Sequence, residues 1–388
     1  MREDGGVNVL EGLVPCDFLR RPALVREALD GRTAIVSDPA NIRWLVGFAG
    51  SLGWVVIGPD RIVLVTDYRY ADRAASDLAA AGLDGLVDID ARRVRAEIAD
   101  AVVGAATASA GPGAVVLAED GHLTHAAWTA FADQLPLEPA GNTIAACRRV
   151  KDAGEVARIA TAAAIADRAL TVVHPMLADH PTEADVRDEL EYRMRRYGAD
   201  GPSYDTIVAS GPTHAARPHH HTGRRTIVEG DTVVIDVGAL VDDYHSDMTR
   251  SFVVGAPTAR QQEIFDIVRE AQAAGLAAVA AGVKAVDVDT VCRDVFRAAD
   301  VEDWYLHGTG HGVGLLIHED PFESATSTDV LMEGDVVTVE PGLYRDGFGG
   351  FRIEDLVSVT ATGCEPLTHL SRDLSLKDAP CLPSPPTT

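Results

Sequence analysis

Residues 229–240 (EGDTVVIDVGAL) align without gaps with residues 333–344 (EGDVVTVEPGLY). Each segment is rich in valine and contains glycine near both ends, which is typical of a buried β-strand. In the alignment Asp236 corresponds to Glu340, so both copies have an acid on this strand. The sequence therefore predicts that one structural unit occurs twice in the chain.

The surroundings of the two segments extend the repeat. A turn follows each segment, and then a second expected strand with another acid, Asp247 in the first copy and Glu354 in the second. Upstream, each copy has an expected helix that contains an Asp-Val pair, at Asp185 and at Asp287. Two such units related by a pseudo-two-fold axis would bring four carboxylates to one shared centre.

Two of the expected helices have N-terminal capping signals. Thr182 is followed by Asp185, and Thr258 by Gln261, at the spacing of a capping box. After Thr182, apolar residues recur at helical spacing, and Gly198 is expected to end that helix.

Four converging carboxylates predict a metal site. A single buried acid is usually satisfied by backbone donors, but four together repel one another unless cations are bound. The acids of the second strands would each bridge two ions, and those of the first strands would each hold one. We expect His311 to be the fifth ligand, because the glycines around it let the backbone approach the site closely. This oxygen-rich shell suits manganese or cobalt better than zinc.

Two ions in such a site would support the hydrolysis of an amide. A water or hydroxide that bridges the ions would attack the polarised carbonyl, and Glu340 would take the proton of the water. His219 and His318, upstream of the two hairpins, would stabilise the oxyanion and protonate the leaving nitrogen. Of the histidine run 219–221 only His219 is assigned a role, since such runs are more often exposed to solvent.

Arg352 has two interpretations. It lies two residues before Glu354, so both side chains would share one face of a strand. The arginine then either forms a salt bridge inside the site, or reaches a carboxylate of the substrate or of a metal ligand.

The length of the chain favours two domains, because 388 residues exceed what one hydrophobic core usually supports. Residues 33–133 alternate short β-rich runs with alanine-rich amphipathic stretches, which indicates an α/β domain. Residues 136–142 contain two prolines and a glycine and form the expected boundary. The predicted organisation is a domain at 1–145, a second domain at 146–375 and a flexible tail at 376–388.

Composition restricts the partners and the compartment. A net charge of −25 repels nucleic acid phosphates and anionic lipid headgroups. The five cysteines are scattered and odd in number, and the sequence shows neither a signal peptide nor an apolar stretch that could span a membrane. We therefore expect a cytoplasmic protein that binds neither nucleic acid nor membranes.

Five short motifs resemble those of the pita-bread metallopeptidases. They are IDVG at 235–238, SDMTR at 246–250, GHGVG at 310–314, VEPG at 339–342 and RIED at 352–355. The five metal-ligand positions of that family are all present, as Asp236, Asp247, His311, Glu340 and Glu354. Two earlier segments, 41–51 (NIRWLVGFAGS) and 66–70 (TDYRY), resemble the creatinase-type amino-terminal domain of Xaa-Pro aminopeptidases and prolidases.

The resemblance implies an α/β (α+β) fold, with a creatinase-like amino-terminal domain and a pita-bread catalytic domain that contains the repeat. It implies two divalent metal ions per chain, manganese or else cobalt or zinc, with Glu340 near the water and with His219 and His318 as substrate and transition-state groups. It also suggests that His307 and Arg352 line a proline subsite. The implied substrates are peptides with proline at the second position, and the implied assembly is a homodimer or homotetramer.

Three functions remain open at this point. An Xaa-Pro aminopeptidase accepts longer peptides, whereas a dipeptidase of the same family cuts only Xaa-Pro. A non-catalytic peptide-binding module of the same fold is the third alternative, and the retention of all five ligand positions argues against it.

Overall fold

The computed structural model describes residues 8–374 of the chain. The tail predicted at 376–388 lies outside these residues. Within the described part, no helix combines the length and the apolar character needed to cross a membrane.

The described residues divide into two units. Residues 16–148 form the amino-terminal unit, and the carboxyl-terminal unit combines residues 149–374 with residues 8–15. A contact within the second unit helps to explain this division, since Arg158 Nη1 donates a hydrogen bond of 3.1 Å to the carbonyl of Val14.

The amino-terminal unit is built on one six-stranded sheet in the order β4-β3-β2-β1-β5-β6. Its strands are β1 (Ala34–Val36), β2 (Gly53–Ile57), β3 (Ile62–Asp67), β4 (Asp88–Arg92), β5 (Val116–Ala118) and β6 (Leu137–Pro139). Its helices are α1 (Arg21–Ala28), α2 (Pro39–Val46), η1 (Tyr68–Tyr70), α3 (Ala71–Ala80), α4 (Glu97–Ala110), α5 (His125–Ala132) and α6 (Thr143–Arg149). The short β-rich runs expected within residues 33–133 are present as strands, for example β1 and β3.

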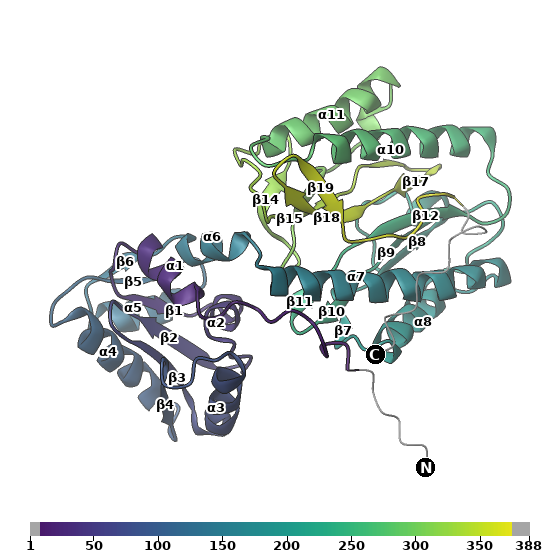
Figure 1. The fold of residues 1–388 in the computed structure, drawn as a ribbon. Coiled ribbons are helices and arrows are strands. Elements are labelled where there is room, and N and C mark those ends of the chain that lie inside the picture. Colours follow the sequence, from purple (N-terminus) through teal and green to yellow (C-terminus); the bar gives the residue numbers. More distant parts are fainter. Residues whose placement is uncertain (1–7, 375–388) are drawn as a thin grey trace, which may run out of the picture. The chain divides into compact units, whose positions relative to one another are not determined.

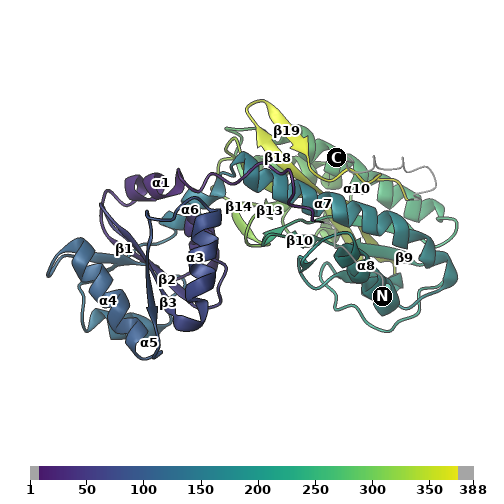
Figure 2. The same cartoon turned by 60° about the horizontal axis from the view of Figure 1, so that its bottom comes forward.

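Helices cover both faces of this sheet, with α3 on one side and α4 on the other (Figures 1 and 2). The buried core joins Ile35 and Val65 of the sheet to Ile98 and Val102 of α4. Neighbouring strands pair both in parallel, as β3 with β4, and antiparallel, as β1 with β2. The unit is therefore a mixed α/β structure, as the alternation of β-rich and alanine-rich segments predicts.

The first half of the carboxyl-terminal unit contains the first copy of the repeat. Its helices are α7 (Ala153–Val173), η2 (His174–Asp179), α8 (Glu183–Arg196) and α9 (Gly211–His214). Its strands are β7 (Gly201–Pro202), β8 (Ile207–Ser210), β9 (Thr232–Asp236), β10 (Ala239–Val241), β11 (Tyr244–His245) and β12 (Thr249–Val253). They form two three-stranded sheets, in the orders β11-β10-β7 and β12-β9-β8.

The second half contains the second copy. Its helices are α10 (Ala259–Ala278), α11 (Ala285–Ala298) and η3 (Glu302–Trp304). Its strands are β13 (Gly310–Gly312), β14 (Glu319–Glu323), β15 (Val336–Val339), β16 (Gly342–Arg345), β17 (Gly349–Arg352), β18 (Asp355–Thr360) and β19 (Gly363–Pro366). Five of them form a sheet in the order β14-β13-β15-β18-β19, and β16 pairs with β17.

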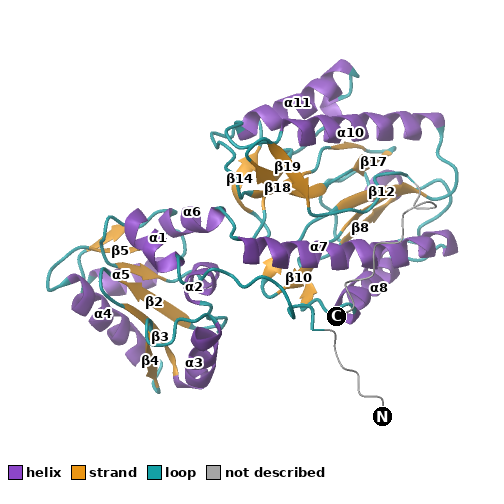
Figure 3. Cartoon of the chain, viewed as in Figure 1, coloured by secondary structure: helices purple, strands orange, loops and turns teal. Residues whose placement is uncertain are grey.

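The duplicated segments occupy corresponding places in the two halves. β9 pairs antiparallel with β12, and in the same way β15 pairs antiparallel with β18. The helix pair α7 and α8 lies on one side of β9, β12 and β18, and the pair α10 and α11 lies on the other (Figures 1 and 3). This arrangement is the one expected of two related halves that share a central layer of strands.

Local signals in the sequence set the starts of two of these helices. Thr182 and Asp185 form a capping box at the start of α8, and Thr258 and Gln261 form one at the start of α10. Both predictions are confirmed. Gly198 follows α8 with a φ of 104°, a backbone conformation that glycine adopts without strain.

Candidate metal centre

The first acid of each copy lies at the end of a strand. Asp236 is the last residue of β9, and Glu340 directly follows β15. The second acids were expected within strands, and this prediction was wrong, because Asp247 lies in the break between β11 and β12 and Glu354 in the break between β17 and β18. At each break the chain passes from one sheet to another, so the regular pairing stops at these acids.

The structure brings the five predicted ligands together, and we call them the carboxylate centre: Asp236, Asp247, His311, Glu340 and Glu354. One ligand atom from each of Asp247, His311 and Glu354 lies within 4.8 Å of the others. His311 Nε2 is 3.6 Å from Asp247 Oδ2 and 3.5 Å from Glu340 Oε1. The two halves of the repeat therefore meet at a single group of acids.

A tyrosine joins Asp236 to this group. The hydroxyl of Tyr204 forms short contacts with Asp236 Oδ1 and Asp247 Oδ1. On the other side, Arg352 Nη2 lies 2.5 Å from Asp236 Oδ2. Asp236 is thus held between a neutral donor and a cation.

Burial and mutual repulsion shift the pKa values of these side chains. The pKa of Asp247 is raised well above its ordinary value, first by burial and then by the charges of Asp236 and Glu340. Burial and then the charges of Asp247 and Glu340 raise the pKa of Glu354 well above its ordinary value, and burial raises the pKa of Glu340 to about 8. Burial lowers the pKa of His311 to about 4, which leaves the imidazole neutral at pH 7 and able to bind a metal.

These observations fit divalent metal ions. Carboxylates that lie close together repel one another when they are ionised, and bound cations stabilise their charged forms. Four acids and one imidazole provide hard oxygen donors and one nitrogen donor.

Glycines allow His311 to reach this position. A Cβ at Gly310 would lie 2.0 Å from the carbonyl oxygen of Thr338, and one at Gly312 would lie 2.5 Å from that of Asp320. Only glycine therefore lets β13 pack between β14 and β15 with His311 on its middle residue.

Arg352 forms a hydrogen-bond network around the centre. Besides its contact with Asp236, it donates to the carbonyl of Pro218 at 2.9 Å, to Tyr344 Oη at 2.8 Å and to Thr249 Oγ1 at 2.9 Å. Its side chain is only 3% exposed. Its closest ionic partner is Asp236 of the other half, at the end of β9, and Glu340 Oε2 lies 3.9 Å from its Nε, whereas the sequence suggested a strand face shared with Glu354.

The three remaining candidates lie at different distances from the centre. The ring of His318 packs against that of His311, with centroids 4.4 Å apart. His307 Nε2 lies 3.0 Å from Tyr344 Oη, so it joins the network of Arg352. His219 is exposed and its ring packs against His221, and within residues 8–374 it forms no hydrogen bond or ion pair with the carboxylate centre.

Comparison with known proteins agrees with this architecture. The pattern of metallopeptidase family M24 matches residues 157–361, and that of the creatinase/prolidase N-terminal domain matches residues 21–150. The chain belongs to metallopeptidase family M24. It is therefore a metallopeptidase with a creatinase-like amino-terminal domain and a pita-bread catalytic domain, as the sequence motifs predict.

Several individual relatives resemble this M24 chain over most of its length. Peptidase YqhT of Bacillus subtilis is 34% identical over 88% of this chain and 94% of its own. Among solved structures, an Xaa-Pro dipeptidase from Bacillus anthracis has a TM-score of 0.86 and 32% identity, over 92% of this chain and 99% of that chain. An X-Pro aminopeptidase from Thermotoga maritima has a TM-score of 0.81 and 30% identity, over 90% and 98% of the two chains.

Two tyrosines of this M24 site were not predicted from the sequence. Tyr204 lies outside the repeated segments, and no periodic pattern distinguishes it. Tyr344 lies inside the second repeated segment, opposite Leu240 of the first. A polar residue that is aligned with a leucine of the other copy could have indicated a functional role for Tyr344.

Proposed function

We propose that this chain is a two-metal exopeptidase that hydrolyses the bond between an N-terminal residue and proline. The observation that carries the proposal is the convergence of five hard and borderline metal donors at the junction of the two halves. The fold is shared with proteins that are named for the cleavage of Xaa-Pro bonds.

The carboxylate centre would hold two divalent ions, and manganese is the proposed metal because most donors are carboxylate oxygens. Such ions supply polarisation of the scissile carbonyl and acidify the attacking water. Asp247 and Glu354 would help to hold the ions, since one ligand atom of each lies within 4.8 Å of the other and of His311. Asp236 is proposed to hold one ion, in the orientation fixed by Tyr204 and Arg352.

Three side chains are proposed to move protons or to stabilise charge. Glu340 lies beside His311 and would accept the proton of the attacking water. His318 packs against His311 and, with His219, would stabilise the oxyanion and protonate the leaving nitrogen. For His219 this role requires its ring to turn towards the centre when substrate binds, because it is exposed in the structure.

His307 and Arg352 are the proposed residues of the proline subsite. Tyr344 connects them, with hydrogen-bonding distances of 3.0 Å to His307 and 2.8 Å to Arg352. Selectivity for proline has a physical basis, because the Xaa-Pro amide has no N–H and the φ angle of proline is locked. A pocket shaped for the ring would therefore reject peptides that present an ordinary secondary amide.

We propose an aminopeptidase that accepts peptides longer than two residues. A dipeptidase is the second candidate, favoured by the likeness to the Bacillus anthracis enzyme.

We also propose that the chain forms a homodimer or homotetramer. Light scattering of the full chain would test this by measuring the mass of the assembly.

The deciding experiment compares Ala-Pro, Ala-Pro-Ala and Ala-Ala as substrates of the manganese-loaded chain. Release of alanine from the first two, with none from Ala-Ala, is the expected result. Cleavage of Ala-Pro alone would replace the aminopeptidase by the dipeptidase. Equal rates on Ala-Ala and Ala-Pro would refute the selectivity for proline altogether.

A further inference from the structure

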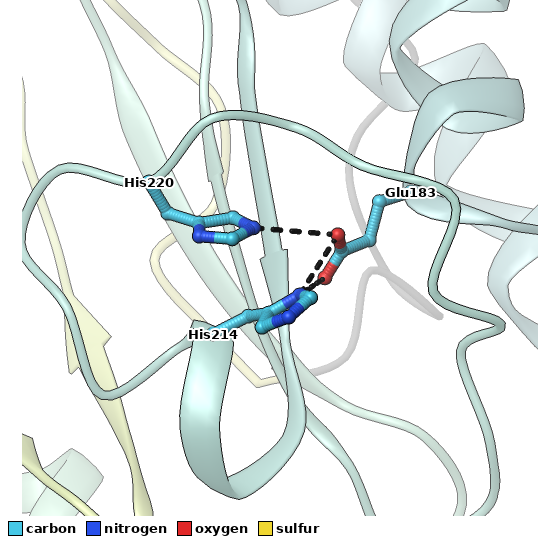
Figure 4. Close-up of side chains that lie close together, drawn as sticks. All are labelled: Glu183, His214 and His220. Atoms are coloured by element: carbon cyan, nitrogen blue, oxygen red, sulfur yellow. Dashed lines mark hydrogen bonds and ion pairs between the residues drawn. The ribbon is translucent and has the colours of Figure 1, made fainter.

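A second group of metal-binding side chains lies outside the carboxylate centre. It consists of Glu183, His214 and His220, and we call it the Glu183 cluster (Figure 4). One ligand atom from each residue lies within 4.8 Å of the others. Glu183 begins α8, His214 ends α9 and His220 belongs to the following loop, so three separate segments converge there.

The two oxygens of Glu183 have different environments. Oε1 accepts hydrogen bonds from the backbone N–H and the hydroxyl of Ser210, at 2.8 and 2.7 Å, and lies 2.9 Å from His214 Nδ1. Oε2 accepts a longer bond of 3.3 Å from the N–H of Gly223 and lies 3.1 Å from His214 Nδ1. Oε2 therefore has a lone pair available on the side that faces the two imidazoles.

His220 points directly at this oxygen. Its Nε2 lies 3.5 Å from Glu183 Oε2, and it makes no hydrogen bond although the atom is buried. The side chain of His220 is only 10% exposed, and that of Glu183 is 0% exposed. Buried polar atoms in proteins are normally hydrogen-bonded, so this nitrogen is a candidate ligand atom for a cation.

The imidazole rings are arranged to face the carboxylate together. The rings of His214 and His220 stack with centroids 4.1 Å apart, and both present a nitrogen to Glu183 (Figure 4). Burial lowers the pKa of His220, and the neighbouring His214 lowers it further, which favours the neutral form that binds metals. The guanidinium of Arg225, which donates a hydrogen bond of 2.7 Å to Ser210 Oγ, is paired with Asp231 at 2.6 Å.

The distances within the cluster match those between ligands of one ion. Two ligands that are each about 2.05 Å from a tetrahedral zinc ion are about 3.3 Å apart. The separations from Glu183 Oε2 to His214 Nδ1 and to His220 Nε2 are 3.1 and 3.5 Å. A cation can therefore enter the cluster with only small movements of the side chains.

We propose that Glu183, His214 and His220 form a third metal site, which binds one zinc-like divalent ion apart from the carboxylate centre. Two imidazoles and one carboxylate are the ligands of many three-residue zinc sites, with water in the fourth position. This donor set prefers zinc over manganese, whereas the carboxylate centre is rich in oxygen. The partly exposed His214, with 28% of its side chain accessible, provides the route of entry.

The ion would fix the loop that borders the carboxylate centre. Pro218 and His219 lie between the two histidines of the cluster, and the carbonyl of Pro218 accepts a hydrogen bond from Arg352. A metal that holds both His214 and His220 closes this loop at its two ends. The site therefore positions the segment 215–219 and takes no direct part in the reaction.

The first test measures the zinc content of the full chain after saturation with Zn²⁺ and dialysis. Wild type is expected to retain about one zinc ion more than His220→Ala and His214→Ala, because each variant removes one of three ligands. His221→Ala is the matched control, since His221 is exposed in the same histidine run, and it should retain as much zinc as wild type. The readout is a difference, so it does not depend on how many ions the carboxylate centre holds.

Equal zinc contents in wild type and His220→Ala would overturn the proposal, provided that circular dichroism shows both proteins folded. Crystals of the wild-type chain grown with Zn²⁺ give a second measurement that needs no variant. An anomalous zinc peak between Glu183, His214 and His220 is expected, and its absence would also overturn the proposal. Amide exchange of 215–222 should slow on addition of Zn²⁺ to wild type but not to His220→Ala.

Discussion

Replacement of Glu340 by glutamine tests whether the ionised carboxylates of the centre destabilise the folded protein when metal is absent. Burial raises the pKa of Glu340 from its ordinary value of 4.5 to about 8, and the charge of Asp236 adds to this rise. The folded metal-free protein then binds the proton more tightly than the unfolded chain. Ionised Glu340 therefore destabilises the fold, and this penalty is absent below pH 4.5 and complete above pH 8.

The magnitude follows from the size of the shift. At about 1.4 kcal/mol per pKa unit, the penalty is on the order of 3 kcal/mol at pH 7 and on the order of 5 kcal/mol above pH 8. Without metal, Glu340→Gln should be more stable than wild type by roughly these amounts, and the two should converge near the ordinary pKa of a glutamate. With manganese present the order should reverse, because the variant lacks one ligand.

The assay is urea-induced unfolding in EDTA between pH 5 and 8.5, with a separate transition fitted for each unit of the chain. Glu365→Gln is the matched control, because Glu365 is exposed on β19, and it should follow wild type at every pH. If the stability of Glu340→Gln and that of wild type depend on pH in the same way, ionised Glu340 carries no such penalty. A variant that is less stable than wild type at pH 8 in EDTA would also refute this penalty.

Three further changes address the centre and its support. Asp247→Ala should abolish the hydrolysis of Ala-Pro and release at least one metal ion while the far-UV spectrum stays unchanged, and full metal content would contradict this. Tyr204→Phe removes the hydroxyl that contacts Asp236 and Asp247, so manganese affinity should fall roughly 10-fold in calorimetry, and an unchanged affinity would count against it. Asp355→Asn leaves the buried Arg250 without its carboxylate, so unfolding of the metal-loaded protein should become easier by about 3–5 kcal/mol. A loss of less than about 1 kcal/mol would contradict the last prediction.

The duplicated strands and the helix starts were predictable because their signals are local. The ungapped match of 229–240 with 333–344 predicts two equivalent strands, and β9 and β15 confirm them. The acids were expected on these strands, and the structure places Asp236 at the last residue of β9 and Glu340 directly after β15. The capping box at Thr182 uses residues within a single turn, so no distant contact is needed to form it.

The positions of the second acids show where local reasoning fails. Asp247 and Glu354 follow β-rich segments and were expected within strands, yet both lie where the chain changes sheets. Such a break depends on which strands pair, and pairing is decided by residues far away in the sequence.

The amino-acid sequence is enough to predict the family, the repeat and the five side chains that converge, because residue type and short spacing encode them. The three-dimensional fold brings Tyr204 into contact with both Asp236 and Asp247 and pairs Arg352 with Asp236. It also decided that His220, taken from its sequence as part of an exposed run, is nine-tenths buried against Glu183. These contacts join segments that are 32 to 116 residues apart, and chain folding alone brings such distant groups within bonding distance.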